Sequence, residues 1–413
     1  MESAAFVGLK DWIAIHILSY CEKPKEILGF SQTSRKCHNL TILYEQSKIW
    51  NPIPLRVCVS SGCRCRRRVI SEESLISFLS TKRSKTVEVC GSLTLLGNCL
   101  KAISHINSVN CLHFSLTGMD SKSSKSVDFS LPDGLTAKDF SNLTELTLHS
   151  SEMSNISLHS CCKLFRLIGG SLTSLSFWPS TPTGVVAALN ECCPNLRYLR
   201  MDACRKFPDT PPHFCPHLEE LSMSYPEEDY VNSAYVAPKV KKCSIRGADD
   251  DIETILYALS MASREICYLD YGDSEATASE EVVCAIAKQF PVLQYLKLTS
   301  EGAAKTLSAS TMHYLGSCCP LLSTLDFSGL IVYFDDDALE ALGYVYPSLR
   351  HVRLGFTADI ADRMYTVLTM SSSIREVVFV MLEDSLQARE EARQTCNMMQ
   401  DMFRNVLFRI DNN

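Results

Sequence analysis

The sequence predicts an α/β solenoid in which short strand–turn–helix units stack along the chain, and three periodic features indicate this fold class. The first is an apolar triplet with the spacing LxxLxL, whose successive copies begin 22 to 29 residues apart. The second is a proline just before many triplets, at Pro194, Pro216, Pro238, Pro291, Pro320 and Pro347. The third is a run of apolar residues at helical spacing ahead of the proline, as in Val282, Val283, Ile286, Ala287 and Phe290.

The triplets mark the expected strands. Ten copies are clear: Leu143-Leu146-Leu148, Leu172-Leu175-Phe177, Leu196-Leu199-Met201, Leu218-Leu221-Met223, Val240-Cys243-Ile245, Ile266-Leu269-Tyr271, Leu293-Leu296-Leu298, Leu322-Leu325-Phe327, Leu349-Val352-Leu354 and Ile374-Val377-Phe379. Proline ends the preceding helix and keeps the next residues extended. A single unit cannot bury its apolar side, so stacked units share one core, with parallel strands on the concave side and helices outside.

The period of the triplets is typical of leucine-rich repeats. It predicts a leucine-rich-repeat horseshoe over residues 84–382, with weaker early copies at Val87-Val89 and Val109-Leu112-Phe114. The repeats resemble the cysteine-containing class, in which Cys often precedes the proline and can also follow the strand. Cys193, Cys215 and Cys319 match the first position, and Cys204 matches the second.

Composition limits the class of protein. Of 413 residues, 46% are hydrophobic and 21% are charged, as in an ordinary globular chain and unlike a disordered one. The net charge of −7 argues against generic binding of nucleic acid or of an anionic membrane. The N-terminus lacks the features of a secretory signal and no run of 18 apolar residues occurs, so we expect a cytoplasmic or nuclear protein. The 20 cysteines are then expected to be reduced, and mostly small buried apolar residues.

Residues 1–52 do not follow the repeat and predict a small helical unit. Ile13, Ile17 and Tyr20 lie at helical spacing, and Pro24 interrupts the pattern before a second apolar run. The order of residues resembles the F-box motif at Leu9, Ile13, Ile17, Leu18, Ser19, Tyr20, Glu22, Pro24, Leu28, Ser31, Gln32, Arg35 and Trp50. Two positions depart from that motif: Lys10 replaces its usual Pro, and Cys37 replaces its usual aromatic residue.

The resemblance implies the substrate receptor of a Skp-cullin-F-box ubiquitin ligase, in which the repeats bind the target protein. The F-box would dock on the Skp adaptor of the cullin ligase core through Leu9, Ile13, Ile17, Leu18, Ile27, Leu28 and Phe30. The alternative is a helical cap on the open end of the solenoid. In that case the chain would be a scaffold for protein–protein interaction with no role in ubiquitin transfer. Residues 53–83 would connect this unit to the repeats.

The concave strand face is the expected site for the target protein. Positions between the triplet residues should point away from the core. From these positions we select Trp178, Tyr198, Arg200, Asp202, Tyr268, Asp270, Tyr295, Lys297 and Arg353 as the candidate target-binding residues. The same face would also carry Glu220, Lys242, Arg246, Asp326 and His351. Tyr and Arg are frequent anchors of protein interfaces, and charges of both signs suit a protein better than nucleic acid or membrane. The alternative is an ordinary solvent-exposed sheet face that binds no partner.

No pattern in the sequence predicts an enzyme, a cofactor or a metal site. GxxxxGK[ST], HExxH, GxSxG and GxGxxG motifs are absent. Cys58, Cys63 and Cys65, beside the run Arg64 to Arg68, lack the paired spacing of a zinc site. The runs 249–251 and 335–337 are all Asp, and each precedes a helical stretch, so we expect them to cap helices.

Residues 383–413 are expected to close the last repeat with a helix and a tail. Ala388, Ala392, Cys396, Met399 and Phe403 recur at helical spacing, which is enough for one apolar stripe.

Overall fold

The computed structural model describes part of the chain. The described residues are 55–58, 68–69, 86–91, 93–104, 109–116, 131–150, 156–177, 185–201, 215–224, 239–246, 256–257, 259–261, 263–273, 280–300, 306–329, 333–335, 337–381 and 386–412. They fall into two compact units, divided between residues 152 and 153. The expected F-box-like residues 9–50, with all seven candidate adaptor contacts, lie outside the described residues.

The first unit is a parallel sheet with a helix. Its elements in chain order are β1 (Leu55–Cys58), β2 (Arg68–Val69), β3 (Thr86–Gly91), α5 (Leu93–Ser104), β4 (Cys111–Leu116), the 3-10 helix η2 (Ala137–Phe140) and β5 (Glu145–Ser150). The strands run in the order β2-β1-β3-β4-β5 and every pair is parallel. Strands β1 and β2 precede residue 84, so the sheet includes residues that the sequence had assigned to a connecting segment.

The second unit repeats the same arrangement. Its elements are α6 (Leu158–Ile168), η3 (Gly169–Ser171), β6 (Ser174–Phe177), α7 (Val185–Cys192), β7 (Tyr198–Met201), β8 (Glu220–Ser224), β9 (Lys242–Arg246), β10 (Tyr268–Asp273), α9 (Glu280–Gln289), β11 (Tyr295–Ser300), β12 (Thr306–Leu307), α10 (Ala309–Cys318), β13 (Thr324–Gly329), β14 (Tyr333–Phe334), α11 (Ala341–Tyr344), β15 (His351–Gly355), α12 (Ala358–Met370), β16 (Glu376–Met381), α13 (Leu386–Met402) and β17 (Leu407–Asn412).

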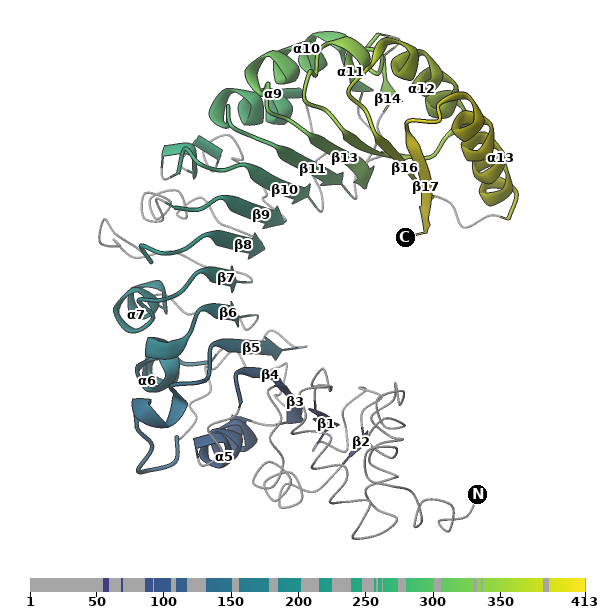
Figure 1. The fold of residues 1–413 in the computed structure, drawn as a ribbon. Helices are drawn as coiled ribbons and strands as arrows, with labels where there is room; N and C mark the ends of the chain where they lie inside the picture. The colour runs from purple at the N-terminus through teal and green to yellow at the C-terminus, as the bar shows by residue number, and fades with distance from the viewer. Residues whose placement is uncertain are drawn as a thin grey trace, which may run out of the picture. The chain divides into compact units, whose positions relative to one another are not determined.

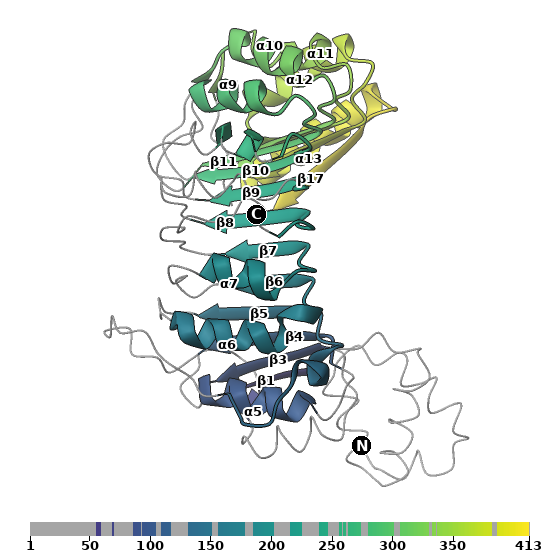
Figure 2. The same cartoon turned by 90° about the vertical axis from the view of Figure 1, so that its left-hand side faces the viewer.

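The strands of the second unit form one parallel ladder, apart from the short pair β12 and β14. The order is β6-β7-β8-β9-β10-β11-β13-β15-β16-β17, so each strand pairs with the strand of the next repeat. Within this unit the helices α9, α10, α11 and α12 cover one side of the sheet (Figure 1), and strands β6 to β9 lie side by side (Figure 2). The predicted fold, an α/β leucine-rich-repeat solenoid, is confirmed for the described residues.

The core consists of the predicted triplets. Every residue of the ten copies is buried, and the residues between them along β6 and β7 are half-buried or exposed. This alternation follows from the two-residue period of a strand, which sends neighbouring side chains to opposite faces. The burial of Val87, Val89, Leu112 and Phe114 shows the same pattern in the weaker early copies.

A repeated β-turn connects each helix to the next strand. The first triplet residue donates its N–H to the carbonyl three residues earlier, as in Leu196 to Cys193 (3.2 Å) and Leu218 to Cys215 (2.9 Å). Proline occupies the second place of these turns, where its restricted φ is favourable and no N–H is required. The prolines seen in the sequence are therefore turn residues as well as helix terminators.

The cysteines before these prolines are buried in the core. Cys193, Cys215 and Cys319 are free thiols with almost no exposed surface. Burial raises the pKa of Cys215 and of Cys319 to about 12, since a thiolate would lose its hydration there. These thiols therefore stay protonated and pack as small apolar groups, as the sequence predicted. Cys204, the match to the second Cys position of the class, lies outside the described residues.

Short polar side chains begin the helices. Ser157 accepts from the N–H of Ser160 (3.2 Å) at the start of α6, and Thr357 accepts from Ile360 (3.1 Å) at the start of α12. Asp335 accepts from the N–H of Ala338 (2.7 Å) and also from Ala309 of α10 (3.0 Å). Asp335 thus caps the turn before α11 and contacts the first residue of α10, whereas the N-cap residue of α11 itself is Glu340, which makes no side-chain cap. Residues 249–251 lie outside the described residues.

The end of the chain adds a strand that the sequence analysis did not anticipate. Helix α13 buries Ala392, Cys396 and Met399, three of the five residues in the stripe that the spacing predicted, while Ala388 and Phe403 are half-buried. After it, β17 joins the sheet edge in parallel with β16. The Gln400 side chain then donates to the carbonyl of Val406 (2.9 Å) and accepts from the N–H of Phe408 (3.2 Å). Gln400 therefore satisfies part of the outer edge of β17, which would otherwise offer unpaired backbone groups.

None of the helices in the described part of the chain is both long and apolar enough to cross a membrane.

Candidate functional site

The outward side of the sheet in the second unit carries aligned rows of side chains, because its strands pair in register. One row places Tyr198, Glu220, Lys242, Tyr268, Tyr295, Thr324, His351 and Glu376 on successive strands from β7 to β16. A second row holds Arg200, Ser222, Ser244, Asp270, Lys297, Asp326 and Arg353 on β7 to β15. We call this surface the sheet face; it lies opposite the buried triplet residues.

Two tyrosines stack at the centre of the sheet face. Tyr268 and Tyr295 are paired in register on β10 and β11, and their rings lie 4.1 Å apart at an interplanar angle of 8°. Partial burial raises the pKa of Tyr268. Burial and the nearby charge of Asp326 raise the pKa of Tyr295 well above its usual range. Both phenols therefore remain protonated at neutral pH and can donate hydrogen bonds.

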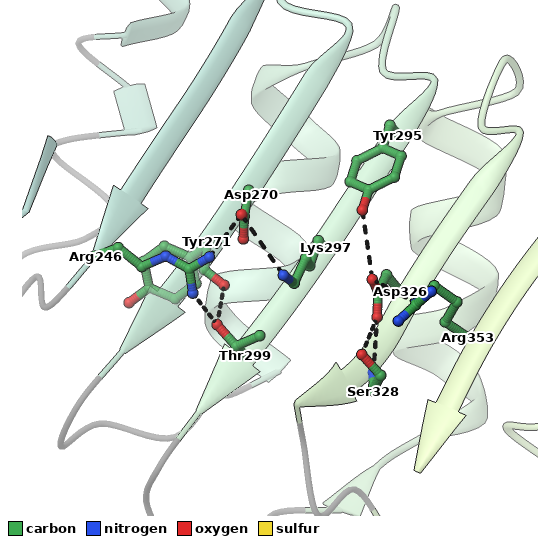
Figure 3. Close-up of polar contacts among 9 residues, drawn as sticks. All are labelled: Arg246, Asp270, Tyr271, Tyr295, Lys297, Thr299, Asp326, Ser328 and Arg353. Atoms are coloured by element: carbon green, nitrogen blue, oxygen red, sulfur yellow. Dashed lines mark hydrogen bonds and ion pairs between the residues drawn. The ribbon is translucent and has the colours of Figure 1, made fainter. Parts of the chain in front are cut away.

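Asp270 holds two basic side chains on the sheet face. Its Oδ2 lies 2.7 Å from a guanidinium nitrogen of Arg246 and 3.9 Å from Nζ of Lys297 (Figure 3). Arg246 also donates to Oγ1 of Thr299 on β11 (2.6 Å). Arg246 thus reaches across β10 from β9 to β11, and the contact fixes its guanidinium over the strand between them.

Gly272 makes this reach possible. It lies on β10 between Arg246 and Thr299, to which it is adjacent in register. A Cβ at this position would meet the guanidinium of Arg246 and the hydroxyl of Thr299 at less than contact distance. The absence of a side chain at residue 272 therefore opens the path along which Arg246 crosses the strand.

Asp326 organises the second charged group. Its Oδ1 accepts from the N–H (3.0 Å) and the hydroxyl (2.5 Å) of Ser328, and Oδ2 accepts from the Tyr295 hydroxyl (3.5 Å). Nε of Arg353 lies 3.1 Å from the same Oδ2, as an ion pair and not as an aligned hydrogen bond. Arg353 also donates to Asp411 of β17 (2.9 Å). Asp326 thereby joins Tyr295 to Arg353 (Figure 3).

The structure brings together five of the nine candidate target-binding residues: Tyr268, Asp270, Tyr295, Lys297 and Arg353. Tyr198 and Arg200 are exposed on β7 of the same face, with β8 and β9 between them and this group. Trp178 and Asp202 lie outside the described residues.

The candidate set omitted two residues that hold the group together, Arg246 and Asp326. Both had been placed on this face by the sequence. Asp326 occupies the same strand position as Asp270, and that equivalence was the available signal for its role.

The described residues contain no group of three or more His, Cys, Asp or Glu side chains that could hold a metal ion.

Comparison with known proteins adds little beyond the fold. No protein-family model and no curated protein matches the sequence. Among similar solved structures, a Bacteroides fragilis protein from structural genomics has 11% identity and a TM-score of 0.31, covering 74% of this chain. The match spans 66% of that bacterial chain, just under two thirds of it.

Two further structures are comparably similar. An internalin (inlF) from Listeria monocytogenes has 13% identity and a TM-score of 0.34, over 75% of this chain and 90% of its own. A chain of the yeast Rad7 and Elc1 complex has 14% identity and a TM-score of 0.33, over 79% of this chain and 90% of its own. Similarity at this level carries no argument about function.

Proposed function

We propose that this chain is a recognition protein without catalytic activity, and that the sheet face of its second unit binds a partner protein. The observation that carries the proposal is the connected group on β9 to β15, where a stacked Tyr pair lies beside two Asp-centred charge clusters. Aromatic side chains with a polar tip and basic side chains are enriched where proteins bind proteins. Their mutual contacts hold them in place before binding, which lowers the entropy lost on association.

The role that we propose for this recognition is recruitment of a target to a Skp-cullin-F-box ubiquitin ligase in the cytoplasm or nucleus. Support comes from the sequence of residues 9–50, which resembles the F-box motif. In that role the N-terminal unit docks on the Skp adaptor, and the sheet face holds the protein that receives ubiquitin.

Adaptor binding tests the ligase role. Full-length chain should retain a Skp adaptor in a pull-down, and Ile17→Asp should abolish that retention because a carboxylate cannot be buried in an apolar interface without a large cost. The Tyr268→Ala and Tyr295→Ala double variant is the matched control and should bind the adaptor normally. No retention of the adaptor by the native chain, or equal retention by Ile17→Asp, would leave an interaction scaffold outside the ubiquitin pathway.

Partner binding tests the sheet face. The partner is first identified by affinity purification with mass spectrometry and then titrated against purified variants. The Tyr268→Ala and Tyr295→Ala double variant should bind it at least about tenfold more weakly, as expected when central aromatic contacts are removed. Its melting temperature should change little, because both rings are only half-buried.

The control for this titration is Tyr314→Ala with Tyr344→Ala. These tyrosines are exposed on α10 and α11, away from the sheet face. Partner affinity should stay at the native value in this control. An unchanged affinity in the Tyr268 and Tyr295 variant, or an equal loss in the control, would contradict the proposed site.

A further inference from the structure

We infer that the partner segment bound by the sheet face is acidic, an inference that rests on the proposed function. Four basic side chains carry it: Lys242 and Arg246 on β9, Lys297 on β11 and Arg353 on β15. We call these four residues the basic patch. The inference concerns the chemistry of the partner, because the basic patch determines which charge a bound segment must offer.

The acidic side chains of this region lie beneath the basic ones. Asp270 and Asp326 expose 13% and 5% of their side chains. The basic patch is far more exposed, from 27% for Lys297 and 35% for Arg353 to 58% for Lys242. The carboxylates therefore fix the positions of the bases, and a molecule that approaches the sheet meets the bases first.

The local charge has the opposite sign to that of the whole chain. On the outward rows of β9, β10, β11, β13 and β15 alone there are four basic and two acidic side chains, a formal charge of +2 with His351 neutral. Glu220 and Asp411, which pair with Lys242 and Arg353, lie outside these five strands, on β8 and β17. The chain as a whole carries −7. A basic surface attracts a negatively charged segment and accelerates its encounter with the protein.

Two side chains of the basic patch form surface ion pairs in which a carboxylate of the partner could replace the acid. Lys242 lies 3.8 Å from Glu220, and Arg353 lies 2.9 Å from Asp411. The side chains of these two acids are 44% and 45% exposed, and ion pairs at the surface contribute little to stability. A carboxylate of the partner can therefore replace either acid at small cost.

The carboxylates that flank the basic patch favour a peptide over a nucleic acid. The tyrosines share β10 and β11 with Asp270 and Lys297, and Tyr295 donates to Asp326. They therefore offer ring surface and phenolic donors beside both charge clusters. Glu220 and Glu376 flank the basic patch in the same row, on β8 and β16. These carboxylates limit the length of negative charge that the sheet accommodates, which disfavours a continuous phosphate backbone.

The direct probe is a fluorescein-labelled poly-glutamate peptide, titrated with the full chain and followed by fluorescence anisotropy. We expect saturable binding that weakens as salt is added, because the contact is between exposed charges. The Lys242→Gln and Lys297→Gln double variant should bind about tenfold more weakly, since two positive charges are lost from the patch. Asp270 keeps its contact with Arg246 in this variant, so the fold is preserved.

The control variant removes two positive charges at positions outside the basic patch. Lys239 and Lys288 are exposed lysines, the first before β9 and the second on α9. Their double Gln variant should bind poly-glutamate as the native chain does. Gly272→Ala serves as a second variant: its methyl group displaces the guanidinium of Arg246, so affinity should fall by a few-fold without loss of a charge.

Three results would overturn the inference. The first is binding of poly-lysine or single-stranded RNA in place of poly-glutamate, and the second is an equal loss of poly-glutamate affinity in the two double lysine variants. The third is an unchanged poly-glutamate affinity both in Gly272→Ala and in the Lys242→Gln and Lys297→Gln double variant. The partner titration distinguishes this failure from that of the proposed function. If the tyrosine variant loses the partner but the lysine variant of the patch keeps it, the site stands and the acidic chemistry is wrong. If neither variant affects the partner, the site itself is wrong.

Discussion

Replacing Asp326 with alanine is expected to lower the free energy of unfolding of the second unit by about 3 kcal/mol. The carboxylate is almost fully buried and accepts from both the N–H and the hydroxyl of Ser328. Its removal leaves that N–H without its acceptor and leaves Arg353 beside a cavity. Losing one member of a buried charged group costs more than the pair itself contributes, because the remaining groups stay desolvated.

The matched control is Asp411→Ala, which removes the other acid bound by the same Arg353. The Asp411 side chain is 45% exposed, so its contact with Arg353 is a surface ion pair, for which we expect a change below about 1 kcal/mol. Urea denaturation followed by circular dichroism measures both variants. If the two substitutions lowered the free energy of unfolding by similar amounts, burial of Asp326 would not be the cause of its expected effect on stability.

Gly169→Ala is expected to destabilise the same unit by about 2 kcal/mol through steric overlap. A Cβ on residue 169 would lie 2.5 Å from the carbonyl oxygen of Cys192 and 2.7 Å from the thiol of Cys193. The first of these atoms belongs to the backbone of the next repeat, and the second is buried. Neither can move away without disturbing the turn in which Cys193 accepts from Leu196. The cause is close approach and not φ, which is −63° at Gly169.

Gly170→Ala provides the comparison one residue along the chain. Nothing lies within 4 Å of a Cβ at this position, and the residue is exposed. We expect no loss, or a gain of about 0.5 kcal/mol, because alanine restricts the unfolded chain more than glycine does. Thermal and urea unfolding of the two variants would settle the difference. If Gly170→Ala were the more harmful change, close packing between neighbouring repeats would not be the constraint at Gly169.

The core of the repeats was predictable because its cause is local and periodic. Leu196, Leu199 and Met201 are buried for the same reason as their counterparts in every other copy: alternate side chains of a strand share a face. The prolines mark the turns because a fixed φ suits their second position. A single period in one sequence therefore predicted the strands, the parallel pairing and the inward residues together.

The sequence predicted which residues lie on the sheet face, but it did not predict which of them contact one another. The alternation of the strands placed Arg246 and Asp326 outward, yet their roles depend on neighbours tens of residues away. Arg246 contacts Thr299 only because β9, β10 and β11 are in register and residue 272 has no side chain. Ionic and hydrogen-bond partners on a face depend on alignment between strands, and one repeat read alone does not contain that alignment.

By itself, the amino-acid sequence determined the fold class, a leucine-rich-repeat solenoid, and the residues that fill its core. It did so because the buried positions of a repeated unit recur along the chain as apolar residues at a regular spacing. The tertiary structure alone decided which polar residues act together, since Asp326 meets Tyr295 and Arg353 across three strands. It also decided that β1 in the first unit and β17 in the second are strands, although neither carries a full triplet. Each of these strands forms because the adjacent strand has backbone N–H and C=O groups that need partners. Those groups are in place only once the neighbouring repeat has folded.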